Sequence, residues 1–512
     1  PDGATTLTLA IRCIKEGETP AAEMSFATAA EAARALVERR RAAAAHVDTS
    51  NTSFNAWLRR SRADLDMLIT DMPTGPYPYA GIPWFSTAFG RDALITALQT
   101  LWLAPDVSKG VLAFLAAKQA TAEVPEMDAE PGKILHETRK GEMAVLGEVP
   151  FGCYYGSVDS TPLYVILAEC YYARTGDLDF IRQIWPNIIA ALAWMRDYGD
   201  IDGDGFLEYD RRADKGLRNQ GWKDSNDSIF HADGRLAEPP IALVEVQGYA
   251  YAAWRGAAVL ARALGEDEAK DDFADRASLL QQRFEEAFWC QDIGTYALAL
   301  DGAKRPCRVR SSNAGHALFA GIATPAHAAR VAATLMDPTG FSDWGIRTVA
   351  TTEARYNPMS YHNGSIWPHD NGLIALGFAR YGLREPLLKV MGGLFAAAEA
   401  TELRRLPELF CGFPRRLGEG PTSYPVACSP QAWSSASAFA LIGAALGISF
   451  HPAEGQVRFT RPALPGFLDE ARLEHLRMGD VSVDLLFRRH TRDTSLNVLR
   501  KEGAAEIVLI SG

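Results

Sequence analysis

The chain has 512 residues, 47% hydrophobic and 22% charged, which is typical of a globular protein and excludes a disordered, collagen-like or coiled-coil chain. Its formal net charge is −11, without the basic surplus typical of nucleic-acid binding, so we expect no nucleic-acid partner. The seven cysteines are spread singly, with no CxxC pair and no zinc-ligand spacing, which predicts reduced thiols and a cytoplasmic protein. The sequence shows neither a signal peptide nor an apolar stretch long enough to span a membrane, so we expect no membrane association.

Residues 1–48 are predicted to form an N-terminal segment. The alternating stretch Thr6–Arg12 predicts a strand, which we interpret as the last strand of an upstream β-domain. The Ala-, Arg- and Glu-rich stretch 27–45 predicts a linker helix.

Residues 49–448 are predicted to be helical throughout. Twelve stretches carry apolar residues at the i, i+3, i+4, i+7 spacing of an amphipathic helix: 52–71, 90–104, 106–120, 160–175, 178–198, 242–264, 267–288, 312–320, 326–336, 364–382, 385–400 and 430–446. Long polar and aromatic connections follow alternate helices, and long loops in a compact domain are usually functional. This pattern predicts a ring of six helical hairpins with its long loops at one mouth.

Residues 449–512 change character and are predicted to form a small C-terminal β-module. Four short stretches alternate in the manner of half-buried strands: 457–460, 481–487, 495–499 and 505–510.

The loops before two of the helices are candidates for sugar binding. Tryptophan faces stack on sugar C–H surfaces, whereas Arg and Asp make directional hydrogen bonds to hydroxyls. An alternative explanation of both clusters is a capped helix with a buried polar network. The candidate residues are Trp84, Phe85, Arg91 and Asp92 in the first loop, and Glu137, Tyr155 and Asp159 in the second.

Three later clusters carry the remaining candidates. Asp224 follows Trp222 and Lys223, and Glu408 lies between apolar residues. Burial raises the pKa of a carboxyl group, and two carboxyl groups across a pocket are the minimum equipment for glycoside hydrolysis. The third cluster contains His362 and Trp367. The chain has no HExxH, phosphate-loop or GxSxG motif. No motif therefore supports zinc-dependent hydrolysis, nucleotide binding or a serine hydrolase.

Taken together, five of these motifs resemble the amylo-α-1,6-glucosidase family of the six-hairpin glycosidase superfamily, over about residues 50–447. They are Trp84-Phe85 with Gly90-Arg91-Asp92, Tyr154–Asp159, Gly221–Asp224, His362–Pro368 and Pro407-Glu408-Leu409. The resemblance implies an all-α (α/α)6 barrel and an inverting, exo-acting α-glucoside hydrolase that needs no cofactor for catalysis. It implies Asp224 as general acid and Glu408 as general base. We expect the sugar to be held by Trp84, Phe85, Arg91, Asp92, Glu137, Tyr155, Asp159, Trp222, Lys223, His362 and Trp367.

The expected substrate is an α-glucan or oligosaccharide, and two alternatives stay open. One is a glycosidase of the same fold that acts on another terminal sugar, such as an α-L-rhamnoside, because fold does not fix the substrate. The other is a carbohydrate-binding protein without activity. The chain lacks room for the glucanotransferase domain of bifunctional debranching enzymes, and the sequence after Asp224 leaves α-1,6 specificity open.

A further motif predicts a structural calcium site. Residues 200–208 follow the first nine positions of a calcium loop, D-x-D-x-D-G-x-x-E, although position twelve is Arg211 instead of the usual Glu. The alternative is a polar turn without a metal. The expected ligands are Asp200, Asp202, Asp204, Phe206 and Glu208.

Overall fold

A computed structural model of the chain describes residues 5–11, 14, 17 and 24–511. The predicted strand over 6–12 is absent from the described part of that stretch, and Arg12 itself lies outside the described residues. Leu7, Leu9 and Ile11 are exposed, and without a neighbouring strand the alternating pattern has no hydrogen-bonding partner. The predicted linker helix is present as α1 (Phe26–Ala43).

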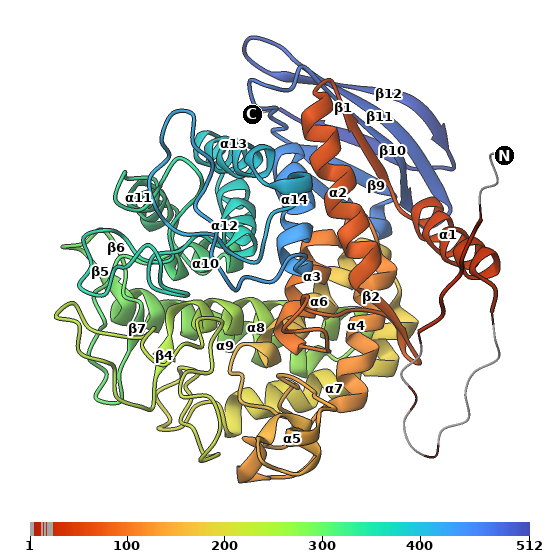
Figure 1. Ribbon diagram of the computed structural model, residues 1–512. Helices are drawn as coiled ribbons and strands as arrows, with labels where there is room; N and C mark the ends of the chain where they lie inside the picture. The colour runs from red at the N-terminus through yellow and green to blue at the C-terminus, as the bar shows by residue number, and fades with distance from the viewer. Residues whose placement is uncertain (1–4, 12–13, 15–16, 18–23, 512) are drawn as a thin grey trace.

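All twelve predicted barrel helices are present, and they form two concentric rings. Successive helices of the inner ring contact one another, and the last contacts the first, so that the ring closes (Figure 1). The inner helices are α3 (Gly90–Thr100), α6 (Ser160–Thr175), α8 (Val244–Leu264), α10 (Asn313–Ala320), α12 (Pro368–Arg380) and α14 (Ala432–Leu446). The outer helices are α2 (Thr52–Leu68), α4 (Pro105–Lys118), α7 (Leu178–Asp197), α9 (Asp267–Phe288), α11 (Pro325–Leu335) and α13 (Arg384–Ala400).

The two rings differ in burial because they differ in the number of covered faces. Every residue of α14 is buried, since an inner helix is covered on all sides. The outer helix α9 buries only a stripe, formed by Phe273, Ala277, Leu280, Phe284 and Phe288.

The N-termini of the inner helices meet at one mouth of the barrel. Polar contacts join them in pairs: α3 to α6, α14 to α3 and α10 to α12. Asp92, Glu245 and Asp370 lie in the first turns of α3, α8 and α12, where the helix dipole favours negative charge. The loops at this mouth contain only short elements: β2 (Ile69–Met72), β3 (Gly75–Pro78), η1 (Pro125–Met127), α5 (Glu142–Val145), η2 (Pro150–Gly152), β4 (Ala242–Leu243), β5 (Trp289–Cys290), β6 (Thr295–Tyr296), β7 (Ala299–Leu300) and η3 (Glu402–Arg404).

The C-terminal region contains two sheets, so the fold is a helical barrel with an added β-rich region, coloured blue in Figure 1. One sheet has the strand order β1-β10-β11-β12 and the other β13-β9-β8. Because β1 belongs to the first sheet, the boundary expected between residues 48 and 49 falls inside a strand. The elements are β1 (His46–Thr49), β8 (Ile448–His451), η4 (Pro452–Glu454), β9 (Gln456–Thr460), β10 (Glu470–Met478), β11 (Val481–Arg489), β12 (Thr494–Glu502) and β13 (Glu506–Ile510).

Strand β10, which has nine residues like β11 and β12, was not predicted, for an identifiable reason. The pairing register shifts between Leu473 and Leu476, and His475 has a φ of +55°. A bulge of this kind puts Leu473 and Leu476 on the same face although they are three residues apart, which breaks the period-2 pattern of a strand.

Among the helices of the described residues, none combines the length and the apolar character that a membrane crossing requires. The cysteines within the described ranges are free thiols, and Cys13 lies outside those ranges.

Candidate active site

Glu408 lies buried at the mouth with its carboxylate held from both sides. The hydroxyl of Tyr361 donates to Oε1 at 2.6 Å, and the backbone N–H of Cys428 donates to Oε2 at 3.0 Å. The pKa of Glu408 is raised to about 7: burial is the largest cause, these two hydrogen bonds lower the value, and the charge of Asp224 adds to the rise. The carboxylate is therefore fixed in direction and ionises close to neutral pH.

Two glycines let the Tyr361 and Glu408 loops approach each other. Gly364 has a φ of +144°, which L side chains rarely adopt, and a Cβ on Gly412 would lie only 1.7 Å from the carbonyl oxygen of Gly364. The bridge between Ile366 and Phe410 then joins the two loops. A larger residue at Gly412 would therefore push the two loops apart.

Asp224 is placed by the two residues before it. The ring of Trp222 lies parallel to His316 and edge-on to His369, with centroids at 6.0 and 4.9 Å. The buried ammonium of Lys223 donates to the carbonyl of Thr348 at 2.6 Å. Anchored in this way, Asp224 has a pKa raised to about 6, chiefly by burial, while the positive charge of Arg91 lowers it.

Asp92 is a third carboxyl in the same cluster, near enough for the charges of Glu408 and Asp224 to affect it. It accepts a hydrogen bond from Gln431 Nε2 at 3.2 Å, across the junction of α3 and α14. Burial is the largest cause that raises its pKa to about 8, and the charges of Glu408 and Asp224 add to the effect. Three negative charges near one another are unfavourable. The cluster of Asp92, Asp224 and Glu408 therefore retains protons near neutral pH, as acid–base chemistry requires.

The cations closest to these carboxyls are already paired. Arg91 Nε lies 2.7 Å from Asp159 Oδ2, and both side chains are buried. Glu137 pairs with Arg139, and burial with the nearby Asp224 charge raises the pKa of Glu137 to about 7 although Arg139 lowers it. These pairs hold the residues around the carboxyl cluster on the side of α3 and α6.

Aromatic residues lie between the loops of Asp224 and Glu408. His362 stacks on Trp367 with centroids 5.0 Å apart, and its Nδ1 lies 2.7 Å from Ser225 Oγ, next to Asp224. Trp367 Nε1 donates to the carbonyl of Tyr361 at 2.9 Å. This cluster connects the loop of Asp224 to that of Glu408.

The other predicted aromatic residues lie farther out. Trp84 is 60% exposed at the rim, where its Nε1 donates to the carbonyl of Val426 at 3.0 Å. Phe85 packs edge-on against Phe89 at 5.5 Å. The hydroxyl of Tyr155 donates to the carbonyl of Lys118, the last residue of α4, so it is directed to the outer ring.

Tyr361 and Gln431 are not among the site residues predicted from the sequence. Tyr361 directly precedes His362 in a cluster that was selected, and this adjacency was the available signal. Gln431 is 339 residues from Asp92, so only closure of the inner ring brings the two together.

Several buried polar atoms near the cluster of Asp92, Asp224 and Glu408 have no hydrogen-bond partner among the described residues. A buried donor or acceptor without a partner costs about 1–3 kcal/mol, so each is a candidate contact for a polyhydroxylated ligand. They include Trp222 Nε1, Gln431 Oε1, Trp433 Nε1 and both ring nitrogens of His369.

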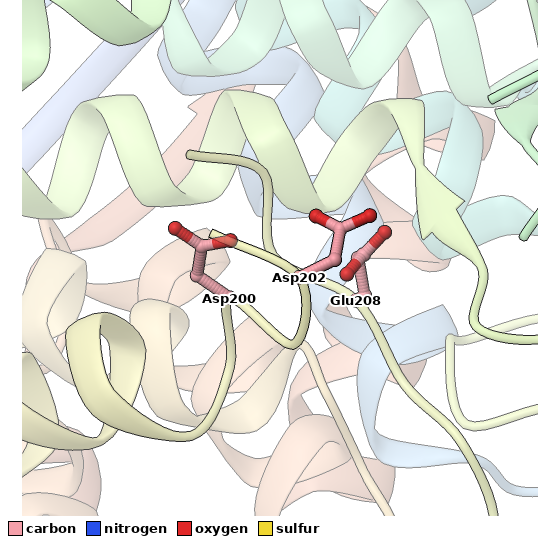
Figure 2. A group of neighbouring side chains, drawn as sticks. All are labelled: Asp200, Asp202 and Glu208. Atoms are coloured by element: carbon pink, nitrogen blue, oxygen red, sulfur yellow. The ribbon is translucent and has the colours of Figure 1, made fainter. Parts of the chain in front are cut away.

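The calcium-like loop lies apart from the three carboxyls. Asp200, Asp202 and Glu208 come together as predicted, with ligand oxygens within 4.8 Å of one another (Figure 2). The ammonium of Lys304, however, contacts Asp202, Asp204 and Glu208. Phe206, expected to offer its carbonyl, donates its backbone N–H to Asp204 Oδ1 at 2.9 Å. The ammonium of Lys304 thus takes the position among Asp202, Asp204 and Glu208 that a metal ion would need.

A comparison with known families gives a match over most of the barrel. The model of the mannosylglycerate hydrolase MGH1-like glycoside hydrolase domain matches residues 87–410. The chain belongs to this family of glycoside hydrolases. The matched range includes Asp92, Asp224, Tyr361 and Glu408. The prediction of a six-hairpin type of glycosidase is thus confirmed, whereas the amylo-α-1,6-glucosidase assignment stays a prediction.

Three of the solved structures similar to this MGH1-like protein carry the names of glycosidases. A mannosylglycerate hydrolase of family GH63 from Thermus thermophilus has a TM-score of 0.54 and 16% identity, with 75% of this chain and 99% of that chain covered. A GH78 rhamnosidase of Bacillus sp. GL1 has a TM-score of 0.63 and 16% identity, with 91% and 42% covered. A sialidase has a TM-score of 0.64 and 13% identity, with 92% and 42% covered.

At these identities the structural likeness concerns the fold, and the chain spans 42% of the length of the sialidase and of the rhamnosidase. Among curated proteins, no sequence matches the chain.

Proposed function

We propose that this MGH1-like protein is an inverting, exo-acting α-glycoside hydrolase with Asp224 as general acid and Glu408 as general base. The observation that carries the proposal is the orientation of Glu408 by Tyr361 and Cys428, close enough to Asp224 for the charge of Asp224 to raise the pKa of Glu408. A fixed, ionisable carboxylate near a second, partly buried carboxyl is the equipment that glycoside hydrolysis needs.

In the proposed reaction Asp224 protonates the glycosidic oxygen as the bond from that oxygen to C1 breaks. Glu408 removes a proton from a water molecule whose oxygen forms the new bond to C1 from the opposite face. Trp222 Nε1 and Gln431 Oε1, which lack protein partners among the described residues, would bind sugar hydroxyls. The inner helices close the barrel behind the carboxyls, so the sugar enters from the mouth, which favours a terminal residue.

An α-glucoside is our first candidate substrate, because the motifs around Arg91, Asp92 and Glu408 resemble those of the amylo-α-1,6-glucosidase family. The name of the matched family favours an α-mannoside as the second, and the rhamnosidase neighbours favour an α-L-rhamnoside as the third. Initial rates on aryl α-D-glucoside, α-D-mannoside and α-L-rhamnoside at equal concentration rank the three directly. If the folded protein hydrolyses neither these three aryl glycosides nor oligosaccharides, the proposal is wrong.

Stereochemistry tests the inverting mechanism independently of the sugar. We expect hydrolysis of the best α-D-glycoside to release the β-anomer first, because water attacks the face opposite the leaving group. Proton NMR of the anomeric signals within the first minutes, before mutarotation, measures this. Initial release of the α-anomer would remove Glu408 from its role as base.

The pH profile follows from the two carboxyls. The reaction needs Glu408 ionised, with a pKa of about 7, and Asp224 protonated, with a pKa of about 6. Activity should therefore fall as pH drops below about 6, where Glu408 is protonated, and as pH rises above about 7, where Asp224 is ionised. We expect a narrow bell in kcat/KM with its maximum near pH ~6.5. A maximum above pH ~8 would contradict the assignment.

A further inference from the structure

The loop over residues 200–208 is folded by its own carboxylates. Asp200 accepts the backbone N–H groups of Gly203 and Gly205 at 2.9 and 3.0 Å. Asp202 accepts that of Asp204 at 3.2 Å, and Asp204 accepts that of Phe206 at 2.9 Å. These turns leave one oxygen each of Asp202 and Asp204 directed to a common point.

Lys304 places its ammonium at that point from a different part of the chain. Its Nζ lies 2.9 Å from Asp202 Oδ2 and 2.8 Å from Asp204 Oδ2, and it also contacts Glu208 Oε1. An ammonium has three N–H groups, so three carboxylates use all of its donors.

The turn that carries Lys304 is itself held in place. Lys304 has a φ of +59°, in the left-handed region that is uncommon for residues other than glycine. Asp301 accepts the backbone N–H groups on both sides of it, from Ala303 and Arg305, at 3.0 and 2.9 Å. The lysine is thus presented to the loop by a turn with its own hydrogen bonds.

Glu208 shows that a cation is needed here. It is 2% exposed, and its Oε2 has no hydrogen-bond partner within the described residues. A buried carboxylate without a compensating charge is strongly destabilising. Lys304 supplies that charge, and Arg211 stands where a calcium loop needs its bidentate glutamate.

We propose that Lys304 replaces the metal ion of a calcium loop, so that this loop is ordered without calcium. Calcium binds oxygen ligands at about 2.3–2.6 Å, so an ion held by the same carboxylates would collide with the ammonium and repel it. The proposal concerns stability and does not depend on the proposed glycosidase function.

The first test uses the wild-type protein. We expect the Tm to be the same with a chelator and with millimolar calcium chloride, and calorimetric titration with calcium chloride to show no saturable binding. A chelator-dependent loss of Tm together with stoichiometric calcium binding would overturn the proposal.

Two substitutions at Lys304 separate charge from space. Lys304→Ala removes the charge and leaves room for an ion, so the Tm should fall by roughly 3–8 °C and calcium should restore most of it. Lys304→Met removes the charge but fills the space, so its Tm should fall without recovery in calcium. Full wild-type Tm in both variants, with and without calcium, would also overturn the proposal.

Lys270→Ala is the matched control. Lys270 pairs with two carboxylates, Asp267 and Asp271, each at 3.5 Å, on the outer helix α9. Those two carboxylates are exposed, so this variant should show at most a small loss of Tm and no response to calcium. A calcium response equal to that of Lys304→Ala would mean a nonspecific ion effect and would overturn the proposal.

Discussion

Asp224→Asn should reduce kcat on substrates with poor leaving groups by about 10²–10⁴-fold, the usual contribution of general acid catalysis. The amide keeps the shape of the side chain but has no proton to transfer to the glycosidic oxygen. A glycosyl fluoride needs no such proton, so a large part of the loss should return on that substrate. Initial rates on a natural glycoside and on the fluoride, measured with the same enzyme preparation, give both numbers.

Asp227→Asn serves as the control, because Asp227 is exposed in the same loop and its backbone carbonyl, which the substitution keeps, accepts from Asn363. It should keep near-normal activity on both substrates. Near-normal activity of Asp224→Asn on a natural glycoside would show that another group is the acid, and the partly protonated Asp92 would be the next candidate.

Glu408→Gln should reduce kcat by about 10²–10⁴-fold on the natural glycoside and on the fluoride alike. The attacking water needs a base with either leaving group, so no recovery is expected with the fluoride. The amide oxygen can still accept the N–H of Cys428, and the hydroxyl of Tyr361 can turn to accept from the amide nitrogen, so the loop should keep its structure.

The stability of this variant distinguishes lost chemistry from lost folding. The folded-state pKa of Glu408 is raised, so its stabilising contribution is complete below the unfolded pKa of about 4.5 and is lost as pH rises through about 7. At pH 8 the neutral glutamine avoids this cost, and the Tm should be equal to or higher than that of the wild type. Glu402→Gln, at an exposed position shortly before Glu408, should leave activity and Tm unchanged. A lower Tm with activity lost in proportion would indicate a structural role instead.

The sequence by itself determined the helical barrel and the main candidates of its site. Helical periodicity is a local property, so each of the twelve stretches marks its own amphipathic face, and all twelve appear in the structure within a few residues of the predicted ends. Asp224 and Glu408 could be selected because the residues beside them form short motifs that follow one another in a recognisable order along the chain. Strand β10 could not be predicted, because a bulge breaks the period on which strand prediction depends.

Only the tertiary structure decided which of these residues touch. The bond from Tyr361 to Glu408 spans 47 residues, that from Gln431 to Asp92 spans 339, and the contact of Lys304 with Glu208 spans 96. No local pattern encodes such pairs, because closure of the inner ring and the course of the loops set their distances. The pKa values near neutrality have the same origin, since burial and neighbouring charge exist only once the chain is folded. For the same reason, the loop over residues 200–208 resembles a calcium site in sequence, and the folded chain places a lysine at its centre.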